Sequence, residues 1–140
     1  MDKLTPYTYY AVVTKVSDGD SCKVDLDLGL GVIKKGVGIR LLGCNAPELK
    51  QAGGAEAKQA LAEYLPIGSK VLLQSVKYDK YGGRLDADIW LIDHAGRPLE
   101  GGNAVQLMAQ HGFVALWDGK GERPVPAPLT ENTLTSNDQL

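Results

Sequence analysis

Cysteine is scarce in this chain, which narrows the chemistry that it can perform. Only two of its 140 residues are cysteines, Cys22 and Cys44. Neither belongs to a Cys-x-x-Cys pair, and no second pair is present, so the sequence carries no zinc-binding pattern. Both cysteines lie in apolar segments typical of strands. We therefore expect buried free thiols.

The sequence also lacks an excess of positive charge. It has 15 basic and 17 acidic residues, a formal net charge of -2. Proteins that bind nucleic acid mainly by electrostatic attraction are usually basic. Any binding of nucleic acid must therefore come from a local site. This suits an enzyme that binds its substrate briefly and then releases it more than it suits a protein that binds nucleic acid tightly.

Long apolar runs are missing as well. No run approaches the ~18 residues of a membrane span, and the segment from Met1 to Tyr10 has no apolar signal region. We therefore expect a cytoplasmic protein with no membrane association. The length suits one domain. From residue 119 onward the composition changes to Gly, Pro, Thr, Ser and Asn, which predicts a domain over 1–118 and a flexible tail over 119–140.

The apolar patterns predict a mixed α+β domain. Alternation and turn residues predict strands at about 7–16, 22–28, 37–42, 70–76 and 86–92, with a glycine-rich bend over 29–36. In the second strand, the predicted buried face holds Cys22, Val24, Leu26 and Leu28. Helices are predicted from about Gly54 and over 103–111. This order is that of a five-stranded OB-fold barrel with a helix between strands three and four and a C-terminal helix, although other α+β domains share it.

Two carboxylates flank a glycine in Asp18-Gly19-Asp20, between the first two predicted strands. Hard cations such as Ca²⁺ take several oxygen ligands, and paired aspartates on a turn supply them. A plain hairpin turn is the alternative interpretation, because Asp-Gly is favoured in turns in any case.

A second polar segment runs from Arg40 to Glu48 and includes Asn45 and Pro47. Arginine is suited to holding a phosphate by two hydrogen bonds, and proline stiffens the loop beside Glu48. The alternative is an arginine on an edge strand followed by a solvated glutamate.

A third segment, Asp79 to Arg84, combines two cations, an aromatic ring and two glycines. Such a loop can place Arg84 on a phosphate while Lys80 and Tyr81 contact the substrate, the ring by stacking on a base. A solvated connection between strands is the alternative.

Taken in order and spacing, these segments resemble the signature of the staphylococcal nuclease (thermonuclease) family. The family pattern has an Asp-Gly-Asp turn after strand one, an Arg-Leu-x-Gly segment ending in Pro-Glu after strand three, and an Asp-Lys-Tyr-Gly loop ending in arginine. The resemblance extends over roughly 9–117 and includes a late helix that begins at Asn103. It implies an OB-fold barrel and nuclease activity.

The resemblance also implies roles for individual residues. Asp20 resembles the main calcium-ligating carboxylate, and Asn45 stands where the family commonly has a second aspartate ligand. Arg40 and Arg84 resemble the arginines that hold the scissile phosphate, and Glu48 resembles the residue that orients or deprotonates the attacking water. The implied cofactor is Ca²⁺.

Three departures from the family pattern affect these assignments. Asn45 offers a carbonyl oxygen without the charge of aspartate, which puts metal affinity in question more than the fold. An extra glycine, Gly83, precedes Arg84, and the alignment is supported by Leu85 and Ala87. The family's long C-terminal helix is missing or is replaced by the proline-rich segment.

The sequence thus predicts a calcium-dependent hydrolase that cleaves DNA, preferably single-stranded or frayed, and also RNA. One alternative is a related module that binds nucleic acid or protein and has lost turnover, which Asn45 mildly favours. Another is an ordinary OB-fold binder of oligonucleotides or of a protein partner, which fits poorly because aromatics are only 6% of the chain and the charge balance is acidic. The sequence does not determine the oligomeric state, for which a monomer is the default expectation.

Overall fold

The fold is taken from a computed structural model that describes residues 8–78, 83–117, 124 and 126. The strands are β1 (Tyr9–Asp18), β2 (Ser21–Gly29), β3 (Val32–Leu41), β4 (Cys44–Asn45), β5 (Lys70–Tyr78), β6 (Leu85–Ile92), β7 (Pro98–Asn103) and β8 (Ala115–Leu116). The helices are α1 (Gly54–Tyr64) and α2 (Ala104–Gln110). Most of the predicted tail lies outside the described residues.

Five strands close into a barrel, as predicted. They are ordered β3-β2-β1-β5-β6, and a parallel pairing between β3 and β6 closes the circle, while β7 extends the sheet beyond β6. The short strands β4 and β8 pair separately. Alternate residues of the barrel strands fill its interior, among them Val13, Val24, Ile39, Leu73 and Ile89, all of which are fully buried. The predicted α+β class and OB-type barrel are confirmed.

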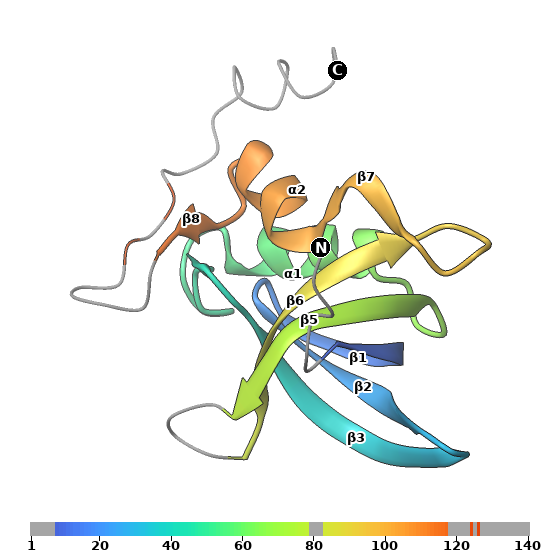
Figure 1. The fold of residues 1–140 in the computed structure, drawn as a ribbon. Helices are drawn as coiled ribbons and strands as arrows, with labels where there is room; N and C mark the ends of the chain where they lie inside the picture. Colours follow the sequence, from blue (N-terminus) through green and yellow to red (C-terminus); the bar gives the residue numbers. More distant parts are fainter. Residues whose placement is uncertain (1–7, 79–82, 118–123, 125, 127–140) are drawn as a thin grey trace.

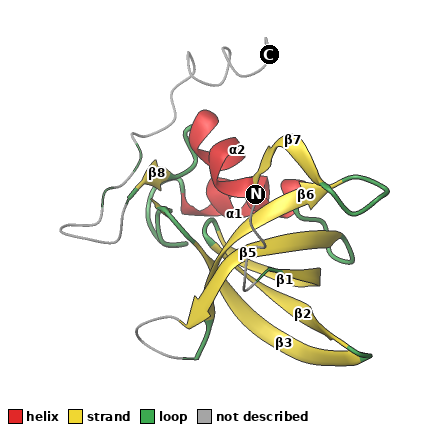
Figure 2. Cartoon of the chain, viewed as in Figure 1, coloured by secondary structure: helices red, strands yellow, loops and turns green. Residues whose placement is uncertain are grey.

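Both helices lie at one end of the barrel (Figures 1 and 2). Helix α1 follows from its apolar stripe: Ala57, Ala60 and Leu61 are buried, and so is Leu65 just beyond its end. Helix α2 begins at the predicted N-cap, where the Asn103 side chain accepts a hydrogen bond from Gln106 N. In the described part of the chain, no helix has the length and apolarity needed to cross a membrane.

The β2–β3 hairpin is longer than the sequence predicts. The expected bend over 29–36 is wrong, because β3 already begins at Val32. The predicted burial of Leu28 is also wrong, since its side chain is 44% exposed. The hairpin extends past the barrel core (Figure 1), so alternation there no longer separates an inner from an outer face.

The tip of this hairpin holds a strained residue, which gives a first prediction. Leu30 is fully exposed and has φ 56°, next to Gly31 with φ 78°. Two positive φ values favour Asn-Gly, and a left-handed leucine is costly. We expect Leu30→Asn to raise the free energy of unfolding by about 1 kcal/mol, measured by urea denaturation. Leu30→Ala removes the same apolar group but keeps the strain, so equal effects of both variants would contradict the explanation.

Candidate functional site

A pocket of about 300 Å³ opens where the β1–β2 turn, the end of β3, the 45–51 loop and the start of β6 meet. It brings together all five predicted catalytic and metal residues that the structure describes. Lys80 and Tyr81, the predicted substrate-binding residues, lie outside the described residues. The residues that line the pocket are Asp18, Asp20, Arg40, Asn45, Ala46, Pro47, Glu48, Gln51 and Arg84.

The Asp18-Gly19-Asp20 turn is fixed by its own hydrogen bonds and by the helix behind it. Asp18 Oδ1 accepts hydrogen bonds from Asp20 N at 3.0 Å and from Ser21 Oγ at 2.8 Å. A Cβ added at Gly19 would lie 2.6 Å from the Cβ of Ala57 in α1. Gly19 does not have a positive φ, so this glycine is needed for space and not for turn conformation. A plain hairpin turn therefore does not account for it.

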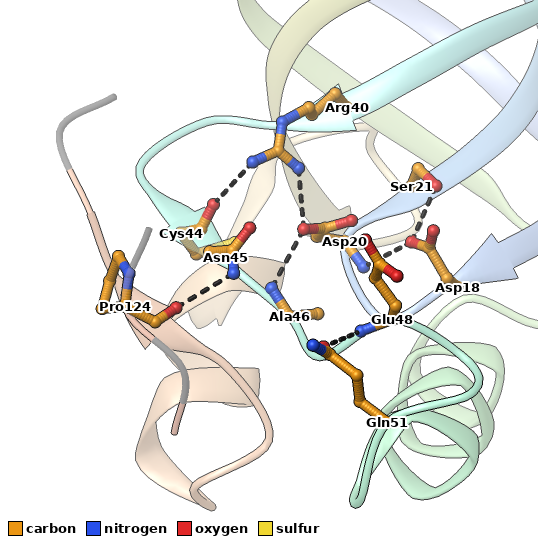
Figure 3. Close-up of polar contacts among 10 residues, drawn as sticks. All are labelled: Asp18, Asp20, Ser21, Arg40, Cys44, Asn45, Ala46, Glu48, Gln51 and Pro124. Carbon is orange, nitrogen blue, oxygen red and sulfur yellow. Dashed lines mark hydrogen bonds and ion pairs between the residues drawn. The ribbon is translucent and has the colours of Figure 1, made fainter. Parts of the chain in front are cut away.

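Arg40 and Asp20 form a largely buried ion pair that lines the pocket (Figure 3). Arg40 Nη1 donates to Asp20 Oδ2 at 2.7 Å, and Arg40 Nη2 donates to Cys44 O at 3.2 Å. The same Asp20 oxygen accepts a 3.0 Å hydrogen bond from Ala46 N. Burial alone would lower the pKa of Arg40, but the Asp20 carboxylate outweighs it and raises this pKa. The guanidinium is therefore charged, and the two bonds use two of its five N–H donors.

The carboxyl groups of Asp18 and Asp20 interact with each other. Burial raises the pKa of Asp20, and the hydrogen bond with Asp18 raises it further. Burial also opposes ionisation of Asp18, but hydrogen bonds with Asp20 and Ser21 outweigh it and lower the pKa of that carboxyl. Two adjacent negative charges repel each other, so the two carboxyl groups titrate in opposite directions. A bound cation would relieve the same repulsion.

Glu48 is exposed at the mouth of the pocket, and Figure 3 shows its carboxylate directed toward Asp18 and Asp20. Its backbone is held by Gln51. Glu48 N donates to Gln51 Oε1 at 2.7 Å, and Gln51 N donates to Glu48 O at 2.8 Å. A Cβ at Gly54 would overlap the Glu48 carbonyl, so the loop sits tightly against the start of α1. Sequence reasoning missed Gln51; its polar side chain three residues after Glu48, ahead of a helix, is the one available signal.

Arg84 reaches the pocket because β3 and β6 run parallel and in register. Ile39 lies opposite Leu85, which places Gly38 beside Arg84. A Cβ at Gly38 would lie 3.2 Å from the Cβ of Arg84. The lack of a side chain at residue 38 thus leaves room for the arginine. Arg84 thus lines the pocket, which is compatible with the alignment that matches Arg84 to the arginine of the family pattern in spite of the extra Gly83 before it.

Asn45 is buried, and its side chain has a defined orientation. Asn45 Nδ2 donates a 2.9 Å hydrogen bond to Pro124 O, in the segment predicted to be a tail. Because a carbonyl can only accept, the amide nitrogen must face Pro124 and the Asn45 carbonyl oxygen must face the other way (Figure 3). The oxygen is therefore available on the pocket side.

These donors suit a hard cation that is weakly held. Carboxylate and carboxamide oxygens are the ligands that Ca²⁺ prefers. No three His, Cys, Asp or Glu side chains in the described ranges are grouped so as to hold a metal ion. A cation at Asp20 would therefore also need the Asn45 carbonyl, backbone oxygens, water or substrate. The positive charge of Arg40 beside Asp20 further reduces the attraction.

Other titratable groups stand apart from this pocket. Burial raises the pKa of Cys22 and of Cys44 to about 12, and both thiols are free and buried as predicted. Neither is a thiolate nucleophile at neutral pH. His111 Nδ1 lies 3.0 Å from Leu107 O and 3.2 Å from the Tyr64 hydroxyl, which fits a structural role.

No family model matches the chain. It is similar to Protein ParB of Escherichia coli, with 31% identity over 118 residues, which are 84% of this chain and 62% of ParB. It is also 30% identical over 95 residues to uncharacterized proteins of Mycobacterium tuberculosis and Mycobacterium bovis, covering 67% of this chain and 33% of each of those proteins. The chain thus spans less than two thirds of the length of each of these relatives.

Proposed function

We propose that the protein is a calcium-dependent nuclease that hydrolyses phosphodiester bonds of single-stranded or frayed DNA and of RNA. One observation carries this proposal: two carboxyl groups, two guanidinium groups and Glu48 line a single pocket of about 300 Å³. The family resemblance of the sequence supports the same activity. Phosphodiester hydrolysis needs these groups, because negative charge accumulates on a five-coordinate phosphorus in the transition state.

The two arginines would bind the reacting phosphate. Arg40 is held rigidly by Asp20 and Cys44 O, so its remaining donors are aimed before substrate arrives. Arg84, immediately before β6, lines the same pocket. Two guanidinium groups around one phosphate oppose the charge of the transition state and fix its orientation.

Glu48 would orient the attacking water and accept its proton. The Glu48 carboxylate is exposed, while the backbone of this residue is fixed by Gln51. The base is therefore accessible to water, and its backbone is held in place. Asp20 and Asn45, with Asp18 alongside, would hold the calcium ion. When bound, Ca²⁺ supplies positive charge at the phosphate oxygens and a position for water. By resemblance, cleavage leaves 3′-phosphate ends.

The test is incubation with end-labelled single-stranded DNA in calcium and in excess chelator. We expect cleavage that requires calcium and leaves 3′-phosphate ends. If calcium-dependent cleavage is missing at any protein excess, the nuclease function is wrong. In that case, retained binding would favour the second candidate, a module that binds nucleic acid without turnover, which the uncharged Asn45 supports.

Asn45→Asp separates the contribution of this residue to folding stability from its proposed contribution to calcium binding. Aspartate cannot donate to Pro124 O, and it adds a negative charge beside the buried Asp20 carboxyl. Without calcium we expect the free energy of unfolding to fall by about 1–3 kcal/mol. With calcium, the added charge should tighten binding by roughly tenfold. Thermal unfolding with and without calcium, together with calorimetric titration, measures both effects.

Asn45→Ala is the matched control, because it loses the Pro124 bond without gaining charge. It should lower the unfolding temperature and weaken calcium binding. A calcium dissociation constant that is unchanged in both variants would remove Asn45 from the metal site and leave it as an anchor for Pro124.

A further inference from the structure

A β-bulge in β1 changes which way Lys15 points. Val13 pairs with Val24, but the next pair is Lys15 with Lys23, so Thr14 is an extra residue in β1. Val13 and Val16 are both buried, whereas Lys15 is exposed. With strict alternation, Lys15 would point inward as Val13 does. Bulges are frequent beside active sites, where they redirect a side chain.

The bulge places two like charges directly opposite each other. Lys15 and Lys23 are cross-strand partners, and both side chains are exposed. Like charges in this relation destabilise a sheet. Within the described ranges, neither lysine forms an ion pair. The arrangement therefore works against stability of the barrel, and a polyanion bound across both lysines would offset it.

The cross-strand row of residues that includes Lys15 and Lys23 continues to the candidate active site. Lys23 pairs with Gly38 on β3, and Gly38 lies beside Arg84 at the start of β6. Lys15 on β1, Lys23 on β2 and Gly38 on β3, which has no side chain, thus lie in one row with Arg84, which precedes β6 and lines the pocket. At about 4.8 Å between strands, the row is roughly 15 Å long. That equals about four nucleotides of a stacked strand at ~3.4 Å each.

The neighbouring row limits where such a strand can lie. Asp25, two residues beyond Lys23, accepts a hydrogen bond from Gly36 N and pairs with Lys35 at 3.5 Å. Its carboxylate bounds the basic row on the hairpin side. In a chain with net charge -2, the row is a local surface on which a polyanion is favoured.

We infer that Lys15 and Lys23 are a second phosphate-binding site, which holds a nucleic-acid strand whose scissile phosphate lies at Arg40 and Arg84. The inference rests on the proposed function for the position of the cleaved bond. It makes polynucleotides, and not mononucleotides, the preferred substrates. Because Gly38 has no side chain, the sugar-phosphate backbone of the bound strand can cross β3 there on its way from the pocket to the two lysines.

The experiment compares Lys15→Gln/Lys23→Gln with Lys70→Gln, which removes an exposed lysine that lines a different pocket with Tyr10 and Gly96. Binding of labelled single-stranded DNA is followed by fluorescence anisotropy with calcium, in a Glu48→Gln background that prevents turnover. We expect the double variant to bind roughly tenfold more weakly and its salt slope to fall by about 1.4, near 0.7 for each lost phosphate contact. Lys70→Gln should resemble its parent.

Kinetics in the chain with Glu48 intact provide a second measurement. In the double variant, KM for long single-stranded DNA should rise while kcat is retained. Hydrolysis of a nitrophenyl ester of a mononucleotide, which reaches only the pocket, should not change. The unfolding temperature should stay equal or rise, because the like-charge pair is gone.

The outcomes distinguish the two proposals. If the double variant binds DNA with the affinity and salt slope of its parent, the second phosphate site is wrong, and the nuclease function is decided by calcium-dependent cleavage alone. If binding depends on the lysines but the chain with Glu48 never cleaves, the site stands and the nuclease function is wrong. If that chain neither binds nor cleaves DNA, both are wrong.

Discussion

Replacing Glu48 by glutamine is expected to lower kcat for calcium-dependent cleavage of single-stranded DNA by roughly 10²- to 10³-fold. The substitution keeps the size of the side chain and removes the group that accepts a proton from water. The hydrogen bonds that fix this residue involve its backbone N–H and C=O groups with Gln51, so the loop should keep its conformation. Because the side chain is exposed, the free energy of unfolding should change by less than about 0.5 kcal/mol. Single-turnover cleavage at saturating calcium measures the effect.

Glu63→Gln is the matched control, since Glu63 is an exposed glutamate near the end of α1 and does not line the pocket. It should cleave at the rate of the parent chain. Near-normal turnover by Glu48→Gln would show that another group activates the water. A loss of activity accompanied by a large fall in unfolding temperature would show that Glu48 has a structural role instead.

The sequence predicts much of this site because its polar residues lie in short segments next to strand ends. Asp20, Arg40 and Arg84 are distant in sequence, yet each comes from a segment that closes or opens a barrel strand. Once the strand order is known, these segments must meet at one end of the barrel. Composition alone does not predict the proposed nucleic-acid site, because nucleic-acid-binding proteins are usually basic, whereas this chain is acidic and has few aromatic residues.

Details that depend on register could not be predicted. Alternation predicts that Lys15 points inward, and only the pairing of Lys15 with Lys23 reveals the bulge at Thr14. In the same way, the pattern at 29–36 contains glycines and lysines typical of a loop, while the ladder with β2 extends β3 back to Val32. The register between neighbouring strands decided both cases, and the apolar pattern of one strand does not contain that information.

The role of Gly19 also depends on tertiary contacts, and it leads to a strong prediction for stability. Gly19→Ala places a Cβ 2.6 Å from the Cβ of Ala57 and 2.8 Å from the Cβ of Ala46. Both neighbours are attached directly to backbone, so neither can rotate away. Either the turn or α1 must move. We expect the free energy of unfolding to fall by about 3 kcal/mol, as for overpacked cores, and the unfolding temperature to fall by roughly 10 °C.

The same substitution should impair the site at temperatures where the chain is still folded. Movement of the turn shifts Asp18 and Asp20 relative to Arg40 and Ala46, the two partners of Asp20 Oδ2, so calcium should bind more weakly. The rescue variant Gly19→Ala/Ala57→Gly removes the closer contact, although glycine within α1 costs about 1 kcal/mol by itself. A double-mutant cycle therefore isolates the contact: a favourable coupling of about 1–2 kcal/mol between positions 19 and 57 is expected. Strict additivity would show that the turn does not rest on α1, and the position of Asp20 would then need another explanation.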